Sequence, residues 1–209
     1  PGFGEAVNAT EEQKYQHALK RIKELRDSPG LLGYYIADEP GPGRTAELRR
    51  ITLAARDLDP NHVTYAAVNQ RLYLHTLKEG FDVVGIDCYP VQHYDDLHAI
   101  YVMGRQARKR TCNARARWDV PQIFDWTVYG RPNENPPTEQ QLRQMTYQWI
   151  ASGGMGIIYF DFSELQVMDY KNPFVEEWAK VKRVANELVD NYVPIILSGY
   201  TGSPRFYLP

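Results

Sequence analysis

The sequence has little of what marks several large classes of protein. It contains two cysteines in 209 residues, and its formal net charge is only −2. No apolar run approaches the ~18 residues that a membrane-spanning helix needs. We therefore expect no disulfide-stapled mini-protein, no membrane span and no nucleic-acid partner. Hydrophobic residues make up 43% of the chain, which is enough to bury a core, and aromatic residues make up 12%.

The two cysteines, Cys88 and Cys112, fall near the end of an expected strand and near the end of the helix expected to follow it. Strand and helix run antiparallel in such a unit, so the two thiols should lie at opposite ends of it. A disulfide needs Cα atoms within about 7 Å of each other. The positions therefore predict that these cysteines form no disulfide.

The N-terminal segment carries two overlapping signals. Asn8 begins the tripeptide Asn-Ala-Thr, which accepts an N-linked glycan in a secretory protein. Thr10 with Gln13 also matches a capping box at the start of a helix, which is the commoner reason for such residues. No basic stretch followed by an apolar run begins the chain, so no signal peptide is expected.

Apolar runs of strand length alternate along the chain with amphipathic helical patterns. The expected strands cover residues 31–37, 62–68, 82–89, 120–127 and 156–162. The expected helices cover residues 11–27, 45–57, 71–79, 94–111, a segment from 138 and 174–192. Strands that are apolar on both faces and alternate with helices are typical of parallel sheets, in either a doubly wound open sheet or a (β/α) barrel.

Two observations favour the barrel. No glycine-rich phosphate loop follows any expected strand, as a nucleotide-binding open sheet would require. Polar residues also recur just past the strand ends, at positions 38/39, 69/70, 87/89, 125/126 and 161/164. In a barrel all these ends meet at one face, where active sites are built. We predict an α/β fold, a (β/α)8 TIM barrel of which this chain holds about five βα units.

The segment 26–40, which ends in Asp38-Glu39-Pro40, resembles the fourth βα unit of clan-A glycoside hydrolases, and is closest to the family-42-like set. The segment 185–199 is similar to the point where such barrels lead into a β-sandwich. The resemblance implies that residues 1–198 hold barrel strands four to eight and that 199–209 are a linker towards a following domain. The missing units would come from the same polypeptide or from a partner chain.

The resemblance also implies a retaining mechanism with Glu39 as the acid/base, and two carboxyl groups about 5–5.5 Å apart. Asp38 stands where many members have asparagine, and like-charge repulsion from it would help to raise the pKa of Glu39. The glutamate that serves as nucleophile on the seventh strand is absent, and Asp125 is the only carboxylate in 121–127. The nucleophile is therefore Asp125 or Glu164, or catalysis has been lost.

Further candidates for binding a substrate come from the same strand ends. Carboxylates accept hydrogen bonds strongly from sugar hydroxyls, and aromatic rings stack on sugar rings. The expected substrate-binding residues are Asp38, Asp87, Tyr89, Trp126, Asp161 and Glu164. Capping of loops and packing in the core are the structural alternatives for each of them. We expect no metal and no cofactor, because the five histidines lack metal-ligand spacing.

The sequence thus predicts a secreted or extracellular-surface glycoside hydrolase that acts on a carbohydrate. The alternative is a catalytically inactive barrel that binds glycans or serves as a structural module of a larger extracellular assembly. The sugar, the linkage and the oligomeric state are left open.

Overall fold

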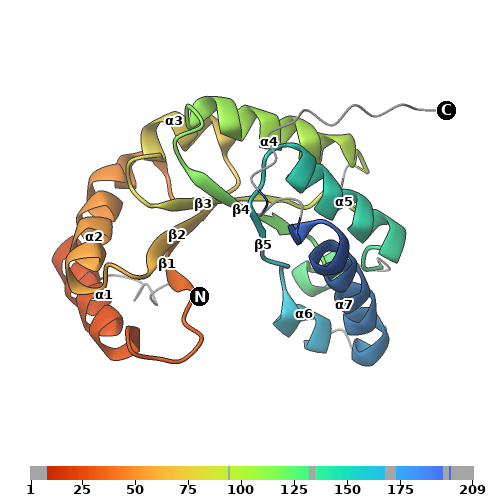
Figure 1. The fold of residues 1–209 in the computed structure, drawn as a ribbon, viewed down its shortest axis with the longest axis horizontal. Coiled ribbons are helices and arrows are strands. Elements are labelled where there is room, and N and C mark those ends of the chain that lie inside the picture. The colour runs from red at the N-terminus through yellow and green to blue at the C-terminus, as the bar shows by residue number, and fades with distance from the viewer. Residues whose placement is uncertain (1–8, 94, 132–134, 168–172, 195–197, 199–209) are drawn as a thin grey trace.

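The computed structural model describes residues 9–93, 95–131, 135–167, 173–194 and 198. Within this part, five parallel strands form one sheet, and each strand lies beside its neighbour in the sequence (Figure 1). The strands are β1 (Gly33–Asp38), β2 (Val63–Val68), β3 (Val83–Cys88), β4 (Ala116–Pro121) and β5 (Gly156–Ile157). The predicted α/β class with a parallel sheet is confirmed. Asn8 and the predicted linker 199–209 lie outside the described residues.

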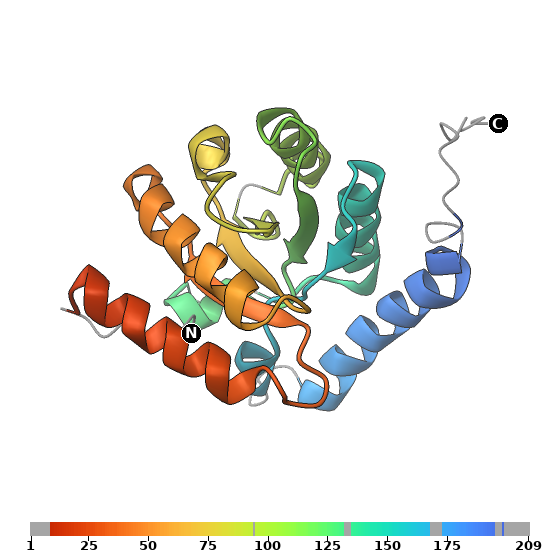
Figure 2. The same ribbon diagram turned by 60° about the vertical axis from the view of Figure 1, so that its left-hand side comes forward.

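Helices form an arc along the outer side of this curved sheet (Figures 1 and 2). They are α1 (Glu11–Leu25), α2 (Thr45–Leu58), α3 (Leu74–Leu77), α4 (His98–Arg110), α5 (Glu139–Ala151), α6 (Phe162–Val167) and α7 (Phe174–Asn191). The short 3-10 helices are η1 (Pro42–Arg44), η2 (Arg71–Tyr73) and η3 (Trp126–Tyr129). Capping boxes at Thr10 and Thr138 begin α1 and α5, and both helices start where the sequence predicts. None of the described helices combines the length and the apolar character needed to cross a membrane.

The two faces of the sheet have different surroundings because successive side chains of a strand point to opposite sides. On β3, Val84, Ile86 and Cys88 point outward and belong to the main hydrophobic core, which also contains buried residues of α1, α2, α4, α5 and α7. Val83 points inward and, with residues from β2 and β4, forms a smaller cluster on the inner face. That inner face borders a cavity described below.

The fourth strand differs from its prediction. The sequence predicts residues 120–127, but β4 spans Ala116–Pro121. The charges of Arg117 and Asp119 obscure the strand in the sequence, yet the two side chains form an ion pair with each other behind the sheet. The apolar residues that suggested a later strand, Ile123 and Phe124, instead form the segment leading to η3.

Smaller differences concern the last strand and the cysteines. β5 is only Gly156–Ile157, and Phe162, predicted to end that strand, begins α6 instead. Beyond β5, a single bridge from Phe160 to Gln122 continues the pairing with the chain after β4. Cys88 is buried and Cys112 is exposed, and no disulfide joins them, as predicted.

Candidate active site

Glu39 lies at the carboxyl end of the sheet, directly after β1. Its backbone has a positive φ of 41°, which is uncommon for a residue other than glycine and recurs at functional sites. Its backbone N–H donates to the carbonyl oxygen of Ala67 on β2 at 2.9 Å. The turn is thereby tied to the neighbouring strand, and the exposed side chain of Glu39 projects from a fixed position.

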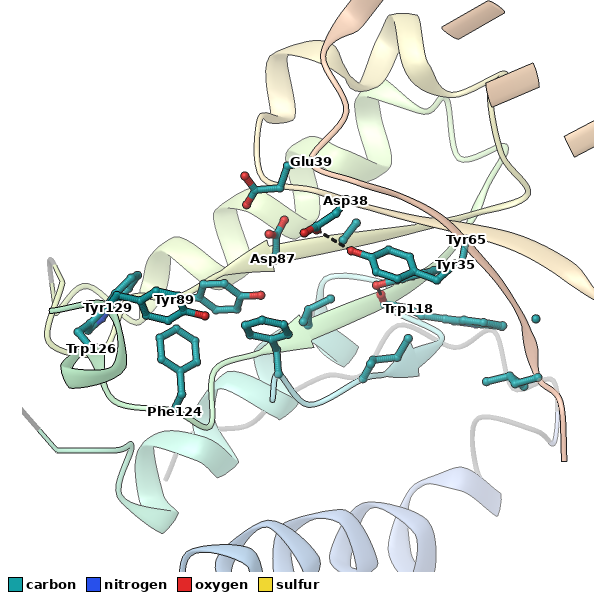
Figure 3. Close-up of a pocket in the computed structure, with 16 residues that line it drawn as sticks. Tyr35, Asp38, Glu39, Tyr65, Asp87, Tyr89, Trp118, Phe124, Trp126 and Tyr129 are labelled. Carbon is teal, nitrogen blue, oxygen red and sulfur yellow. Dashed lines mark hydrogen bonds between the residues drawn. The ribbon is translucent and has the colours of Figure 1, made fainter. Parts of the chain in front are cut away.

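Asp87 faces Glu39 from the inner side of β3 (Figure 3). Its side chain is 6% exposed, and its Oδ1 atom has no hydrogen-bond partner among the described residues. Burial, a hydrogen bond to Glu39 and the charges of Glu39 and Asp38 together raise the pKa of Asp87 to about 8. At neutral pH the carboxyl group of Asp87 therefore holds a proton.

Asp38, the last residue of β1, is held by a side chain of its own strand. The hydroxyl of Tyr35 donates to Asp38 Oδ1 at 2.5 Å (Figure 3). Burial, followed by this hydrogen bond, raises the pKa of Tyr35, so the hydroxyl stays protonated as a donor. Three carboxyl groups thus gather at the end of the sheet, and one of them has a fixed orientation.

Aromatic rings cover the inner face of the sheet below these carboxyl groups. The ring of Tyr65 stacks on Trp118 with centroids 5.9 Å apart, and Tyr35 lies 5.4 Å away on its other side. Tyr65 can lie across β3 only because residue 85 is glycine, since a Cβ atom there would come within 1.8 Å of the Tyr65 hydroxyl oxygen. The three rings form a platform that runs from β1 to β4.

The carboxyl groups and this platform border one cavity of about 540 Å³, which is a suitable size for a small ligand. Its lining residues come from all five strands or from the segments next to them (Figure 3). They are Leu32, Gly33, Tyr35, Asp38, Glu39, Tyr65, Ala67, Asp87, Tyr89, Trp118, Val120, Phe124, Trp126, Tyr129, Ile158 and Phe160. Four predicted substrate-binding residues and Glu39 are among them. The predicted residues are Asp38, Asp87, Tyr89 and Trp126.

Trp126 lies at the edge of the cavity in a fixed orientation. Its indole N–H donates to the carbonyl oxygen of Val91 at 2.8 Å. The guanidinium of Arg131 lies over the ring, 4.6 Å from its centroid, and the ring of His93 lies 5.1 Å away. Tyr89 stacks against Phe160, with centroids 5.6 Å apart. Part of the surface of Trp126 is therefore already covered by neighbours.

Asp125, the first candidate for the nucleophile, does not line this cavity. Its side chain is completely buried, and Oδ1 accepts a hydrogen bond of 2.8 Å from the backbone N–H of Thr127. This is an N-cap interaction, which begins η3. The residue lies beyond the end of β4 because the strand stops at Pro121. The position of Asp125 favours a structural role as a cap over a role as nucleophile.

Asp161 and Glu164 do not line this cavity. Asp161 Oδ1 accepts hydrogen bonds from the backbone N–H of Glu164 at 2.6 Å and from the hydroxyl of Ser163 at 3.0 Å. Burial and the charge of Asp161 raise the pKa of Glu164. The charges of Glu164, Asp161 and Asp38 contribute to a raised pKa of Tyr129, after the larger effect of burial. Tyr129 is therefore influenced by carboxylates from both edges of the sheet, that is, from β1 and from the segment after β5.

Sequence reasoning missed the platform residues Tyr65 and Trp118. The sequence contains a usable signal, because inward positions recur at every second residue of a strand. Tyr65 shares its face with Ala67, and Trp118 shares its face with Val120. The shifted prediction for the fourth strand left Trp118 outside any element, so this periodicity could not be applied to it.

Comparisons with known proteins relate the fold to glycoside hydrolases. No family model matches the chain, and no curated protein matches it. Similar solved structures include a protein from Bacteroides thetaiotaomicron provisionally named as an alpha-L-fucosidase, with a TM-score of 0.58 and 14% identity over 84% of this chain and 60% of that one. A beta-D-glucuronidase from Dictyoglomus thermophilum matches with a TM-score of 0.54 and 16% identity over 77% of this chain and 30% of that one.

A beta-glucuronidase from Ruminococcus gnavus, solved with D-glucuronic acid, matches with a TM-score of 0.51 and 10% identity over 73% of this chain and 29% of that one. The chain thus spans 60% or less of the length of these three structures. At such low identity the likeness shows a glycosidase-like fold.

Proposed function

We propose that this chain is the part of a glycoside hydrolase (β/α) barrel that contains strands four to eight. The order of the five parallel strands, the arc of helices on one side and the glycosidase neighbours all support this proposal. The remaining barrel units would belong to the same polypeptide or to a partner chain. The cavity would bind a sugar at the carboxyl ends of the strands, where barrel enzymes carry their active sites.

The observation that carries the proposal is the contact between Glu39 and Asp87. Glu39 is the exposed member of the pair and Asp87 the buried one, and burial favours the protonated form of Asp87. In the proposed reaction the single proton of the pair moves from Asp87 to Glu39, and Glu39 gives it to the glycosidic oxygen as the bond breaks, which leaves both carboxyl groups ionised. General acid catalysis of this kind contributes a factor of about 10²–10⁴ to the rate.

A retaining mechanism also needs a nucleophilic carboxylate about 5–5.5 Å from the acid. Asp87 is too close to Glu39 for this role, because the two share a hydrogen bond. Asp125 is buried and caps η3. We therefore assign the role to Glu164, which is partly exposed and lies near Tyr129 at the edge of the cavity.

Hydrolysis of a panel of aryl glycosides by the protein tests these assignments. Glu39→Gln should lower kcat by about 10²-fold or more, because the amide cannot donate its proton to the leaving oxygen. Glu79→Gln is the matched control, since Glu79 is an exposed residue that meets only Arg49 among its described ion pairs. Equal rates for the native protein and Glu39→Gln would contradict the role of Glu39. Added azide should restore turnover to Glu164→Ala if Glu164 is the nucleophile.

A glycan-binding module without activity is the second candidate. The buried position of Asp125 favours it, because the segment that resembles the nucleophile strand then offers no carboxylate to the cavity. Saturable glycan binding without hydrolysis of any aryl glycoside would establish this function in place of the first. Hydrolysis that depends on Glu39 would exclude it.

A further inference from the structure

The charges around the cavity are all of one sign. Among its described lining residues are Asp38, Glu39 and Asp87, and there is no lysine, arginine or histidine. A carboxylate of a ligand bound there would lose water and meet negative charge without a cationic partner. Such an arrangement excludes anions by repulsion, as specific binding sites commonly do.

Two further features of the cavity suit a cation. The buried Oδ1 atom of Asp87 has no hydrogen-bond partner among the described residues, so it can accept from a donor on a ligand. The rings of Tyr35, Tyr65 and Trp118 present an aromatic surface beside the carboxyl groups. Aromatic faces attract organic cations, and the attraction is stronger where water is excluded.

A basic side chain, that of Arg131, contacts Trp126 at the cavity edge. It does not line the cavity, and its guanidinium lies over the ring of Trp126. An arginine that recognises a carboxylate presents its planar fork of N–H groups to both oxygens. Arg131 is instead engaged with an aromatic face, so the negative charges of Asp38 and Glu39 have no cationic partner among the described lining residues.

We propose that this cavity discriminates among ligands by charge, so that it prefers protonated amino sugars to neutral sugars and rejects uronic acids. This inference rests on the proposed function, because it specifies the class of sugar that the site takes. It also separates this chain from two of its structural neighbours, which are named as glucuronidases and one of which was solved with D-glucuronic acid.

The test compares the affinities of three matched methyl glycosides, which carry glucosamine, glucose or glucuronic acid, together with the corresponding galactose series. Binding is followed by tryptophan fluorescence at pH 6, because Trp118 and Trp126 line the cavity. We expect each step from amino sugar to neutral sugar to uronic acid to weaken binding by about tenfold, as one unit charge at close range predicts.

Variants show whether the cavity is the origin of that order. Asp38→Asn should reduce the ratio of amino-sugar to uronic-acid affinity by about tenfold. Asp57→Asn removes the same charge from an exposed position at the far end of α2 and should leave the ratio unchanged. Equal or tighter binding of the uronic acid would overturn the inference. Loss of that binding in Arg131→Gln would identify the guanidinium as its receptor.

A non-sugar series separates this inference from the proposed function. If no glycoside binds, the proposed function fails, and benzylamine, benzyl alcohol and benzoate are compared in the same assay. An order of affinity of amine, alcohol and carboxylate that responds to Asp38→Asn would still support charge selection by the cavity. Equal affinities, or a preference for benzoate, would overturn it.

Discussion

Two buried aspartates on neighbouring strands have opposite surroundings in this molecule. Asp87 lies on the inner face of β3 and Asp119 on the outer face of β4, and both are less than a tenth exposed. Burial raises the pKa of both, to about 8 for Asp87 and to about 7 for Asp119. The partners act in opposite directions, because Arg117 lowers the pKa of Asp119 whereas Glu39 and Asp38 raise that of Asp87.

Asp119 is enclosed by groups that satisfy its charge. Arg117 donates to both of its carboxylate oxygens at 2.7 and 2.8 Å, and the same guanidinium donates to the backbone oxygens of Gly104 and Trp149. Asp87 instead faces another acid, Glu39, and keeps one oxygen without a partner among the described residues. A buried carboxyl group paired with a cation has its charge compensated, whereas one with a raised pKa beside a second acid is a candidate for chemistry.

The largest expected effect comes from removing the guanidinium of Arg117, which pairs with Asp119 on the outer face of the sheet. Arg117→Met should lower the free energy of unfolding by about 3–5 kcal/mol, because it leaves Asp119 buried without a partner. The loss should be smaller at pH 5 than at pH 8, since Asp119 can then take up a proton. Urea denaturation at pH 5 and at pH 8 measures this loss of unfolding free energy. The double variant Arg117→Met/Asp119→Leu should recover most of the stability, and an equal loss in both variants would contradict the explanation.

A smaller effect is expected from the inner aspartate and depends on pH. The pKa of Asp87 rises from an ordinary value of 3.8 to about 8 on folding, so its contribution to stability is present below about pH 4 and is lost as the pH rises through about 8. Asp87→Asn mimics the protonated form. Relative to the native protein, it should gain about 2 kcal/mol in unfolding free energy between pH 6.5 and pH 9. An identical pH dependence in the two proteins would exclude the raised pKa, and Asp57→Asn serves as the control.

The smallest effects concern two consecutive tyrosines that point to opposite faces. Tyr35 donates to Asp38 on the inner side, and Tyr34 donates to Asp59 on the outer side, each at 2.5 Å. Each change to phenylalanine should cost about 1 kcal/mol of stability, measured by thermal and urea unfolding. Only Tyr35→Phe should also weaken sugar binding, by a few fold, because Asp38 then loses its fixed orientation. Weaker binding in Tyr34→Phe as well would show that the two faces are not independent.

Local sequence patterns predicted most of the fold. The capping residues Thr10 and Thr138 mark the starts of α1 and α5, because each hydroxyl satisfies a backbone N–H of its own first turn. The fourth strand was misplaced for a reason that no local pattern reveals. Arg117 and Asp119 resemble surface residues until their mutual pairing, and the helix carbonyls around them, are known.

For the candidate site, the sequence indicated the residues but not their relations. Polar residues after apolar strands located Asp38, Glu39 and Asp87 at the cavity. The same rule suggested a catalytic role for Asp125, whose side chain turns back to cap η3. The distinction depends on where β4 ends, and the predicted strand runs to residue 127 whereas β4 stops at Pro121.

The sequence by itself determined the alternation of strands and helices, the parallel sheet and the carboxylates that follow its strands, because these depend on periodicity and on neighbours within one turn. Tertiary structure alone decided that Glu39 meets Asp87 across β2, that Tyr65 lies over Gly85 to reach Trp118, and that Asp119 is neutralised by Arg117. Except for the last pair, these contacts join different strands. They arise from sheet register and from packing. Packing also gives Asp87 and Asp119, which are the same type of residue, opposite surroundings.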